Sequence, residues 1–128
     1  MDEKAIVERI IRTLIPIGVE RIVLFGSRSR GDQLPDSDID ILVVTSDSFI
    51  PSSFKDKMRL KLKVSEALSF LRENFSLDLL VYTRPMYDMF MKQNSSFQRE
   101  ISSTGTILYE RDHLCRIVDH KDNYLLAN

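Results

Sequence analysis

Two aspartates and a glycine-serine pair are the residues whose types and spacing best suit chemistry at phosphorus. Asp38 and Asp40 stand two residues apart at the start of one apolar run, and Gly26-Ser27 directly follows an earlier one. Side chains two apart on a strand share a face, with Cα atoms about 6–7 Å apart. Carboxylates at this separation suit paired divalent cations, which lie roughly 3.5–4 Å apart when they assist an in-line displacement. We therefore predict a metal site at Asp38 and Asp40.

The glycine-serine pair predicts a phosphate-binding turn. A glycine lets backbone N–H groups approach an anion closely, and the Ser27 hydroxyl adds a donor. Arg28 and Ser37 belong to the same loop and are further candidates for nucleotide binding. Their ordinary interpretations are a surface arginine and a serine that only caps a turn. Together, the loop residues suit a triphosphate.

Asp78 is the third candidate metal ligand. It interrupts an apolar run from Phe75 to Tyr82, where a buried carboxylate would carry a desolvation cost unless a charged group compensated it. If this strand lies beside that of Asp38 and Asp40, the three carboxylates form a cluster of hard oxygen ligands typical of Mg²⁺. The alternative is a solvated residue on an edge strand.

The elements that position these residues alternate in an α/β (α+β) pattern. Helical spacing of apolar residues predicts helices over about 2–15, 52–74 and 84–103, and a marginal one in the tail after residue 110. Compact apolar runs predict strands at 19–25, 38–44 and 77–83, with a short apolar segment at 106–109. We expect a small mixed sheet with helices packed mainly on one face.

The second predicted helix has a recognisable start and two candidate faces. Ser53 with Asp56 three residues later resembles a capping box. The spacing predicts one core-facing side, made of Phe54, Met58, Leu62, Leu68 and Leu71. The basic residues between them, of which Lys55, Arg59 and Lys63 share a side, are interpreted as a solvated surface; contact with RNA or an acidic partner is the alternative.

Composition excludes several classes of protein. The chain has 128 residues, 43% of them hydrophobic, which is enough for one compact domain with a core. The 18 basic and 19 acidic residues give a net charge of −1, unlike a strongly basic nucleic-acid binder. No apolar run reaches the roughly 20 residues of a membrane span. Cys115 is the only cysteine, and the N-terminus lacks a secretory pattern. We expect a soluble, cytoplasmic domain.

The motif Gly26-Ser27, ten residues, then Asp38-Ile39-Asp40 resembles the signature of the nucleotidyltransferase superfamily related to DNA polymerase beta. The chain length and the start Gly-Ser-Arg-Ser-Arg-Gly resemble its minimal nucleotidyltransferase (MNT) domains, which include the MntA-type antitoxins of HEPN/MNT toxin–antitoxin pairs. The resemblance covers residues 1–109 as one MNT domain. Residues 110–128 lie outside it as a polar C-terminal tail.

The resemblance implies a role for each motif residue. Gly26 and Ser27 would grip the nucleotide phosphates, and Asp38 and Asp40 would bind two Mg²⁺ ions. Asp78 would help to bind the catalytic metal and act as general base. The implied reaction is attack on the α-phosphorus of ATP with release of pyrophosphate. The implied acceptor is a protein hydroxyl, a tyrosine of a cognate HEPN-type ribonuclease toxin, with the chain acting as antitoxin.

Two other functions stay open at the level of sequence. One is a binding module that masks the toxin without catalysis. The other is a small-molecule adenylyltransferase of the antibiotic-modifying kind, for which the sequence indicates no acceptor pocket. The chain ends soon after the predicted catalytic core, which favours an acceptor presented by a protein partner. We expect no contact with a membrane and no direct binding of nucleic acid.

Overall fold

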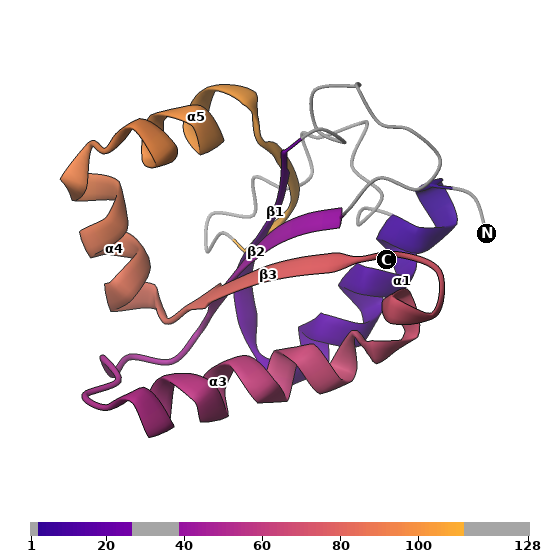
Figure 1. Cartoon of the computed structure of the whole chain (residues 1–128), viewed down its shortest axis with the longest axis horizontal. Coiled ribbons are helices and arrows are strands. Elements are labelled where there is room, and N and C mark those ends of the chain that lie inside the picture. Colours follow the sequence, from indigo (N-terminus) through magenta and orange to yellow (C-terminus); the bar gives the residue numbers. More distant parts are fainter. Residues whose placement is uncertain (1–2, 27–38, 112–128) are drawn as a thin grey trace.

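A four-stranded mixed sheet forms the centre of the structure (Figure 1). The structure is a computed structural model, and it describes residues 3–26 and 39–111. The strand order is β3-β2-β1-β4. The strands are β1 (Val19–Phe25), β2 (Ile39–Thr45), β3 (Leu77–Tyr82) and β4 (Thr106–Glu110). β1 is antiparallel to both β2 and β4, whereas β2 and β3 are parallel. The predicted mixed sheet is confirmed.

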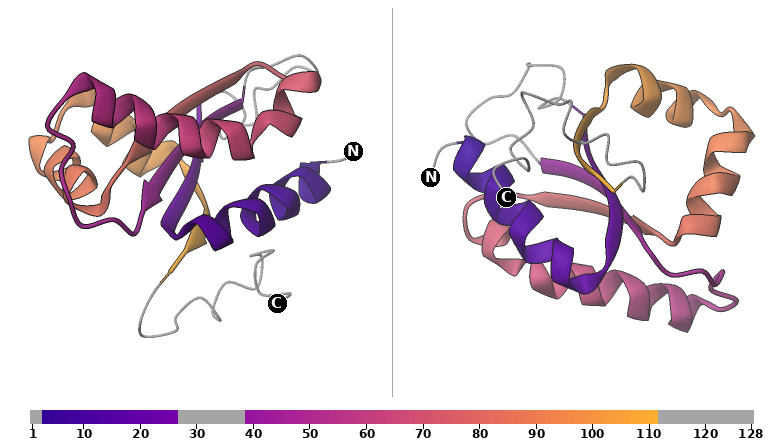
Figure 2. Two further views of the ribbon diagram at one scale, coloured as in Figure 1. Left: turned by 90° about the horizontal axis from the view of Figure 1, so that it is seen from below. Right: turned by 180° about the vertical axis from the view of Figure 1, so that it is seen from behind.

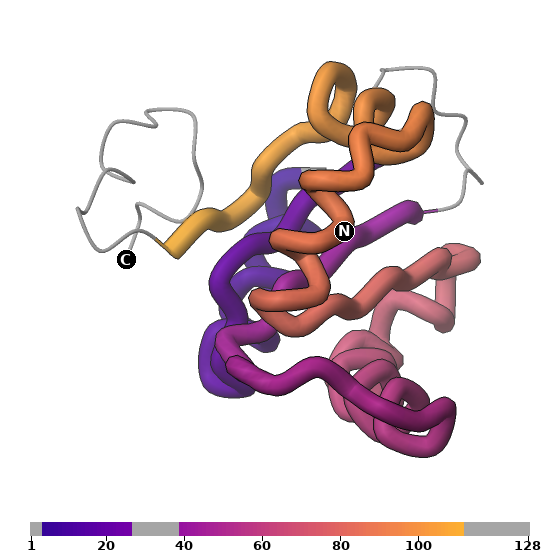
Figure 3. Tube along the Cα trace, turned by 90° about the vertical axis from the view of Figure 1, so that its left-hand side faces the viewer, coloured from indigo at the N-terminus to yellow at the C-terminus, as the bar shows by residue number. Residues whose placement is uncertain are grey.

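Helices cover both faces of this sheet. On one face lie α1 (Glu3–Leu14), α3 (Phe54–Ala67) and the 3-10 helix η2 (Ser69–Glu73). On the other lie α4 (Arg84–Gln93) and α5 (Ser96–Thr104). In the right-hand view of Figure 2, seen from behind, α1 crosses in front of the strands, and Figure 3 shows α4 and α5 in front of the strands. No helix in the described part of the chain is long and apolar enough to span a membrane.

Most of the core lies on the α1 and α3 face. Alternation along β2 sends Ile39, Ile41 and Val43 to this face, where they pack against residues such as Leu14 and Val64. The opposite face carries a smaller buried cluster, made of Val23, Leu42, Val44, Phe90 and Ile101. The face with α1 and α3 thus holds the larger core, as expected of helices packed mainly on one face. α4 and α5 cover the smaller core on the other face.

The helix predicted over about 84–103 is two helices. α4 ends at Gln93, and Asn94, its C-cap, takes a left-handed conformation with φ of 52°. Asparagine tolerates this conformation better than most residues do. Ser95 then caps α5, and its hydroxyl accepts a hydrogen bond of 3.1 Å from the backbone N–H of Gln98. The prediction of one continuous helix was wrong because this local capping competes with continuation.

The start of α3 was predicted correctly and part of its core face was not. Ser53 accepts a 3.1 Å hydrogen bond from the Asp56 backbone N–H, as the capping pattern indicated. Leu68 and Leu71 are buried, but the predicted core residues Phe54, Met58 and Leu62 are exposed. The side of α3 that packs on the sheet instead carries Leu60 and Val64. The basic residues of α3 are exposed, as expected.

Candidate active site

Asp40 and Asp78 are neighbours on parallel strands. Asp40 is the second residue of β2, Asp78 is the second residue of β3, and the two are paired in the β2–β3 register. Adjacent strands lie about 4.7–4.9 Å apart, so side chains from paired residues on one face emerge next to each other. Two residues further along each strand, on the same side, stand Leu42, which is buried on the α4 and α5 face, and Leu80, which packs against that cluster. Asp40 and Asp78 therefore lie on the α4 and α5 face as well. The register thus brings together two of the three predicted ligands.

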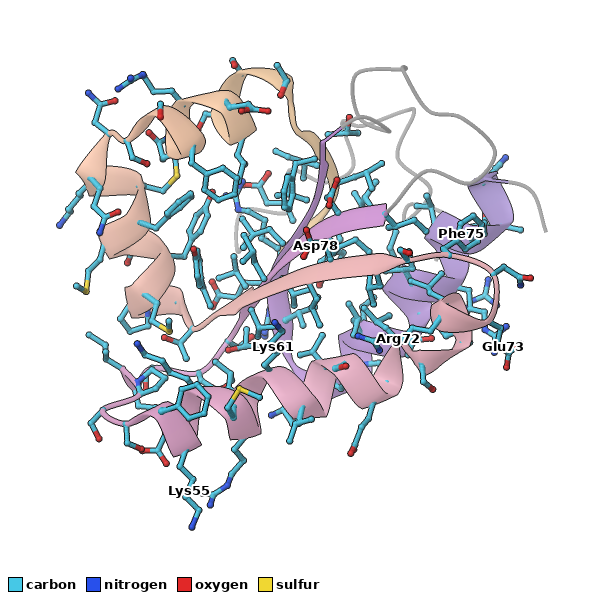
Figure 4. The ribbon with its side chains drawn as sticks, viewed as in Figure 1. Lys55, Lys61, Arg72, Glu73, Phe75 and Asp78 are labelled. Carbon is cyan, nitrogen blue, oxygen red and sulfur yellow. The ribbon has the colours of Figure 1, made fainter. Side chains whose placement is uncertain are left out.

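The two carboxylates differ in their surroundings. Asp40 is half-buried on a central strand, and Asp78 is exposed on β3, which is an edge of the sheet. In Figure 4 Asp78 points away from α3. Asp78 is a solvated residue on an edge strand, which was the alternative interpretation, so the desolvation cost of a buried carboxylate does not arise. The half-buried Asp40 and the exposed Asp78 together offer oxygen ligands toward solvent, from which a metal ion and a phosphate could enter.

Gly26 lies directly against the carboxylate of Asp40. Phe25, the last residue of β1, pairs with Asp40 across the antiparallel register, and the chain then turns at Gly26 with φ of 79°. A Cβ at position 26 would overlap Oδ2 of Asp40 and lie 2.9 Å from its Cγ. Only a glycine fits here, both for its backbone conformation and for the space it leaves. The contact is between the Gly26 backbone and the chain's own Asp40 carboxylate.

Four of the predicted site residues lie outside the described residues. These are Ser27, Arg28, Ser37 and Asp38. Their phosphate- and metal-binding roles stay predictions, as do those of Gly26, Asp40 and Asp78. Within the described ranges, no three Asp, Glu, His or Cys side chains converge as a metal site would require. The donor set of Asp40 and Asp78 fits Mg²⁺, and Asp38, two residues before Asp40, is the predicted third ligand.

An aromatic cluster on the α4 and α5 face of the sheet joins Phe25 of β1, Tyr82 of β3, Phe90 of α4 and Phe97 of α5. The rings of Phe25 and Phe97 meet edge to face with centroids 5.8 Å apart, and Phe97 also contacts Phe90 at 6.0 Å. The Tyr82 and Phe90 rings are 5.3 Å apart, and burial raises the pKa of the Tyr82 hydroxyl above its ordinary value of 10.0. Sequence reasoning missed Phe97, although the amphipathic spacing of its helix could have indicated an inward side.

A polar pocket of about 280 Å³ lies at the other end of β2, beneath α4. It is lined by Glu20, Arg21, Val44, Arg84, Tyr87, Asp88 and Arg111. Arg21 donates to Glu110 at 2.7 Å, and Arg84 lies 3.6 Å from Glu20. Val44 is four residues from Asp40, so the pocket is about 13 Å from the carboxylate pair at about 3.3 Å per residue. Arg111 donates to the Ser46 hydroxyl at 3.3 Å. The pocket does not adjoin the site.

Comparison with known proteins identifies the family. Residues 8–114 match the family described as Polymerase beta, Nucleotidyltransferase. The chain belongs to this family, and it is a nucleotidyltransferase. The match spans β1, the residues after it, and the strands that carry Asp40 and Asp78.

Three similar proteins of Methanocaldococcus jannaschii carry the name "putative protein adenylyltransferase". MJ0604 is 30% identical over 110 residues, which covers 84% of this chain and 98% of the relative. MJ0435 is 40% identical over 68 residues, covering 53% and 70%. MJ0141 is 24% identical over 91 residues, covering 71% and 87%.

A solved structure supports the fold. The crystal structure of a toxin-antitoxin with AMP-PNP aligns with a TM-score of 0.51 and 24% identity, over 84% of this chain and 75% of the other. At this identity, the likeness shows the polymerase beta-like nucleotidyltransferase fold alone.

Proposed function

We propose that this chain transfers AMP from ATP to a hydroxyl group of a partner protein, in a reaction that depends on Mg²⁺. The observation that carries the proposal is the pairing of Asp40 with Asp78 in the β2–β3 register, beside the Gly26 turn. Two carboxylates on one face can hold metal ions, and a glycine turn beside them can offer backbone N–H groups, so together they suit a metal-bound triphosphate.

Each residue has a defined task in this reaction. Asp38, Asp40 and Asp78 would hold two Mg²⁺ ions, which neutralise phosphate charge and orient the α-phosphorus. Gly26 and Ser27 would donate to the phosphates, with Arg28 and Ser37 as further contacts. The acceptor oxygen bonds to the α-phosphorus, the bond from that phosphorus to the bridging oxygen breaks, and pyrophosphate leaves with the bond electrons. Asp78, the accessible carboxylate, takes the proton of the acceptor hydroxyl.

A protein acceptor is favoured by the relatives and by the geometry. The M. jannaschii protein MJ0604 carries the name of a protein adenylyltransferase and is matched over nearly its whole length. The polar pocket is about 13 Å from the carboxylates by strand rise, too far to present a small acceptor to the same phosphorus. This pocket therefore does not supply the acceptor site that an antibiotic-type adenylyltransferase would need.

The antitoxin role is the finer part of the proposal. The resemblance to MNT domains implies that the acceptor is a tyrosine of a HEPN-type toxin and that its modification silences the toxin. A non-catalytic antitoxin that only masks its partner is the second candidate. It predicts binding that does not depend on the carboxylates.

The experiment uses ATP labelled at the α-phosphate, Mg²⁺, the purified chain and lysate of the cells that produce it. A parallel reaction contains ATP labelled at the γ-phosphate, and EDTA replaces Mg²⁺ in a third. The proposal predicts a protein band labelled from the α-position only, absent with EDTA and with Asp40→Asn. A band from γ-labelled ATP would indicate phosphorylation instead. Unlabelled protein with a partner still bound would favour the masking function.

A further inference from the structure

Three apolar side chains of α3 are exposed on the side of the helix that faces away from the sheet. Phe54 is 77% exposed, Met58 37% and Leu62 49%. They follow one another at intervals of four residues, each about 40° further round a helix of 3.6 residues per turn, so they form one stripe over two turns. We call these three residues the α3 stripe. Phe49 and Ile50, in the segment before α3, are also about half exposed.

Basic residues border the α3 stripe on both sides. Taking about 100° per residue, Lys55, Arg59 and Lys63 lie on one flank, and Lys57 and Lys61 lie on the other. In Figure 4 Lys55 and Lys61 leave α3 in different directions. α3 holds these five basic residues and two acidic ones, Asp56 and Glu66, whereas the whole chain has a net charge of −1. Positive charge is thus concentrated around the exposed apolar stripe.

The lysines of this border are available for a partner. Arg59 lies 3.9 Å from Asp56, and both side chains are largely exposed. None of the four lysines has a salt bridge to another residue within 3–26 and 39–111. An apolar centre with a polar rim is the usual anatomy of a protein-binding surface, and a charged rim favours a partner of opposite charge.

We infer that the α3 stripe is the docking surface for the partner protein, and that the partner presents apolar side chains bordered by aspartates and glutamates. Charge complementarity selects this occupant. A second copy of this chain would bring basic rims together, which is unfavourable. α3 packs against β3, the edge strand that carries Asp78. Since the α3 stripe faces away from the sheet and Asp78 points away from α3, a partner seated on the stripe would reach Asp78 around the edge of the sheet at β3. The inference rests on the proposed function for its partner and names the surface that holds it.

The test places a photo-crosslinking residue on the stripe. The full chain carrying Met58→p-benzoylphenylalanine is irradiated in lysate of the cells that produce it. Met89, on α4 and 53% exposed, receives the same substitution as the matched control. The inference predicts one protein crosslinked from position 58 and not from position 89. The crosslinked peptide, sequenced by mass spectrometry, should place acidic residues around apolar ones.

Charge reversal makes this outcome specific. Lys55→Glu/Lys61→Glu in the crosslinking chain should lower the yield about tenfold at low salt, and Lys55→Arg/Lys61→Arg should retain it. Phe54→Ser should lower the yield by a similar factor while leaving the melting temperature unchanged, because the side chain is exposed. Equal crosslinking from both positions, insensitivity to charge reversal, or absence of an adduct would overturn the inference.

Other occupants are also outcomes that overturn it. An adduct to this chain itself would assign the surface to a second copy. Charge-dependent sedimentation with vesicles of phosphatidylcholine containing phosphatidylserine, and no protein adduct, would assign it to an anionic membrane. Failure here is distinguishable from failure of the proposed function. Asp78→Asn should abolish AMP transfer and leave the crosslink intact, whereas a wrong docking surface would leave transfer intact and the crosslink absent.

Discussion

Gly26 lies so close to Asp40 that a side chain on the glycine would occupy the space of the aspartate carboxylate. The glycine also has φ of 79°, a conformation that costs a residue with a side chain roughly 1–2 kcal/mol. The end of β1 and the start of β2 are therefore coupled at a single point, and the position of Asp40 depends on the absence of a Cβ across the strand pair.

Gly26→Ala should lower the rate of AMP transfer by more than its loss of folding stability explains. The new methyl group displaces the Asp40 carboxylate, and a misplacement of this size costs roughly 100-fold in rate. Gly18→Ala is the matched control, because Gly18 has φ of 95° and a Cβ there would meet nothing within 4 Å. Both variants should lose about 1–2 kcal/mol of stability in urea unfolding, but only Gly26→Ala should lose AMP transfer. Equal activity of the two variants would contradict the role of the contact.

Binding of ATP with Mg²⁺ should stabilise the chain in the absence of any partner. At 100 times the dissociation constant, a ligand that binds only the folded state adds about 2.7 kcal/mol, which raises Tm measurably. Asp78→Asn should abolish this rise. Asp88→Asn, the same chemical change at an exposed position of α4, should retain it. Stabilisation by ATP that is equal with EDTA and with Mg²⁺ would show that metal ligation is not part of binding.

Truncating a buried leucine should lower the unfolding free energy more than truncating an exposed one. Leu42 is fully buried at the centre of β2, so Leu42→Ala should cost about 2–5 kcal/mol of unfolding free energy. Leu62→Ala removes the same atoms from a side chain that is 49% exposed, and it should cost less than about 0.5 kcal/mol. Urea denaturation of the two variants checks this. A large loss for Leu62→Ala would place the α3 stripe in the core after all.

Tyr82 should make the folded state less stable as the pH rises above the ordinary tyrosine pKa of 10.0. Burial raises the pKa of its hydroxyl above 10.0, so the folded state keeps its proton at a pH where the unfolded state loses it. The unfolded state then binds fewer protons, and stability falls as the pH rises above 10.0 toward the raised pKa. Urea midpoints at about pH 9 and about pH 11 measure the loss. Tyr82→Phe should reduce it; an unchanged loss would mean that other groups are responsible.

The sequence predicted the chemistry better than the packing. The spacing of Gly26 and Asp40 and the strand around Asp78 were recognisable because a compact apolar run and a glycine turn are local signals. That β2 and β3 are adjacent, with Asp40 opposite Asp78, was only a condition in the sequence argument, since register depends on how distant segments pair.

The misassigned side of α3 has a physical reason as well. Phe54, Met58 and Leu62 have the spacing of a core face, but Leu60 and Val64 have it too, and only the position of the sheet decides between them. An apolar stripe that a partner covers carries the same signal as one that the chain's own core covers. The break at Asn94 was missed because an αL asparagine inside a helical pattern is a weak stop signal.

The most direct test of the central claim asks whether Asp40 and Asp78 act as one site. AMP transfer from α-labelled ATP is measured for Asp40→Asn, Asp78→Asn and the double variant, with Asp88→Asn as the control. Each single change should lower the rate by roughly 10²–10⁴-fold, and the double variant should be no slower than the slower single one, because residues that act as a unit are not additive. Transfer that survives either substitution, or losses that multiply in the double variant, would contradict a shared site.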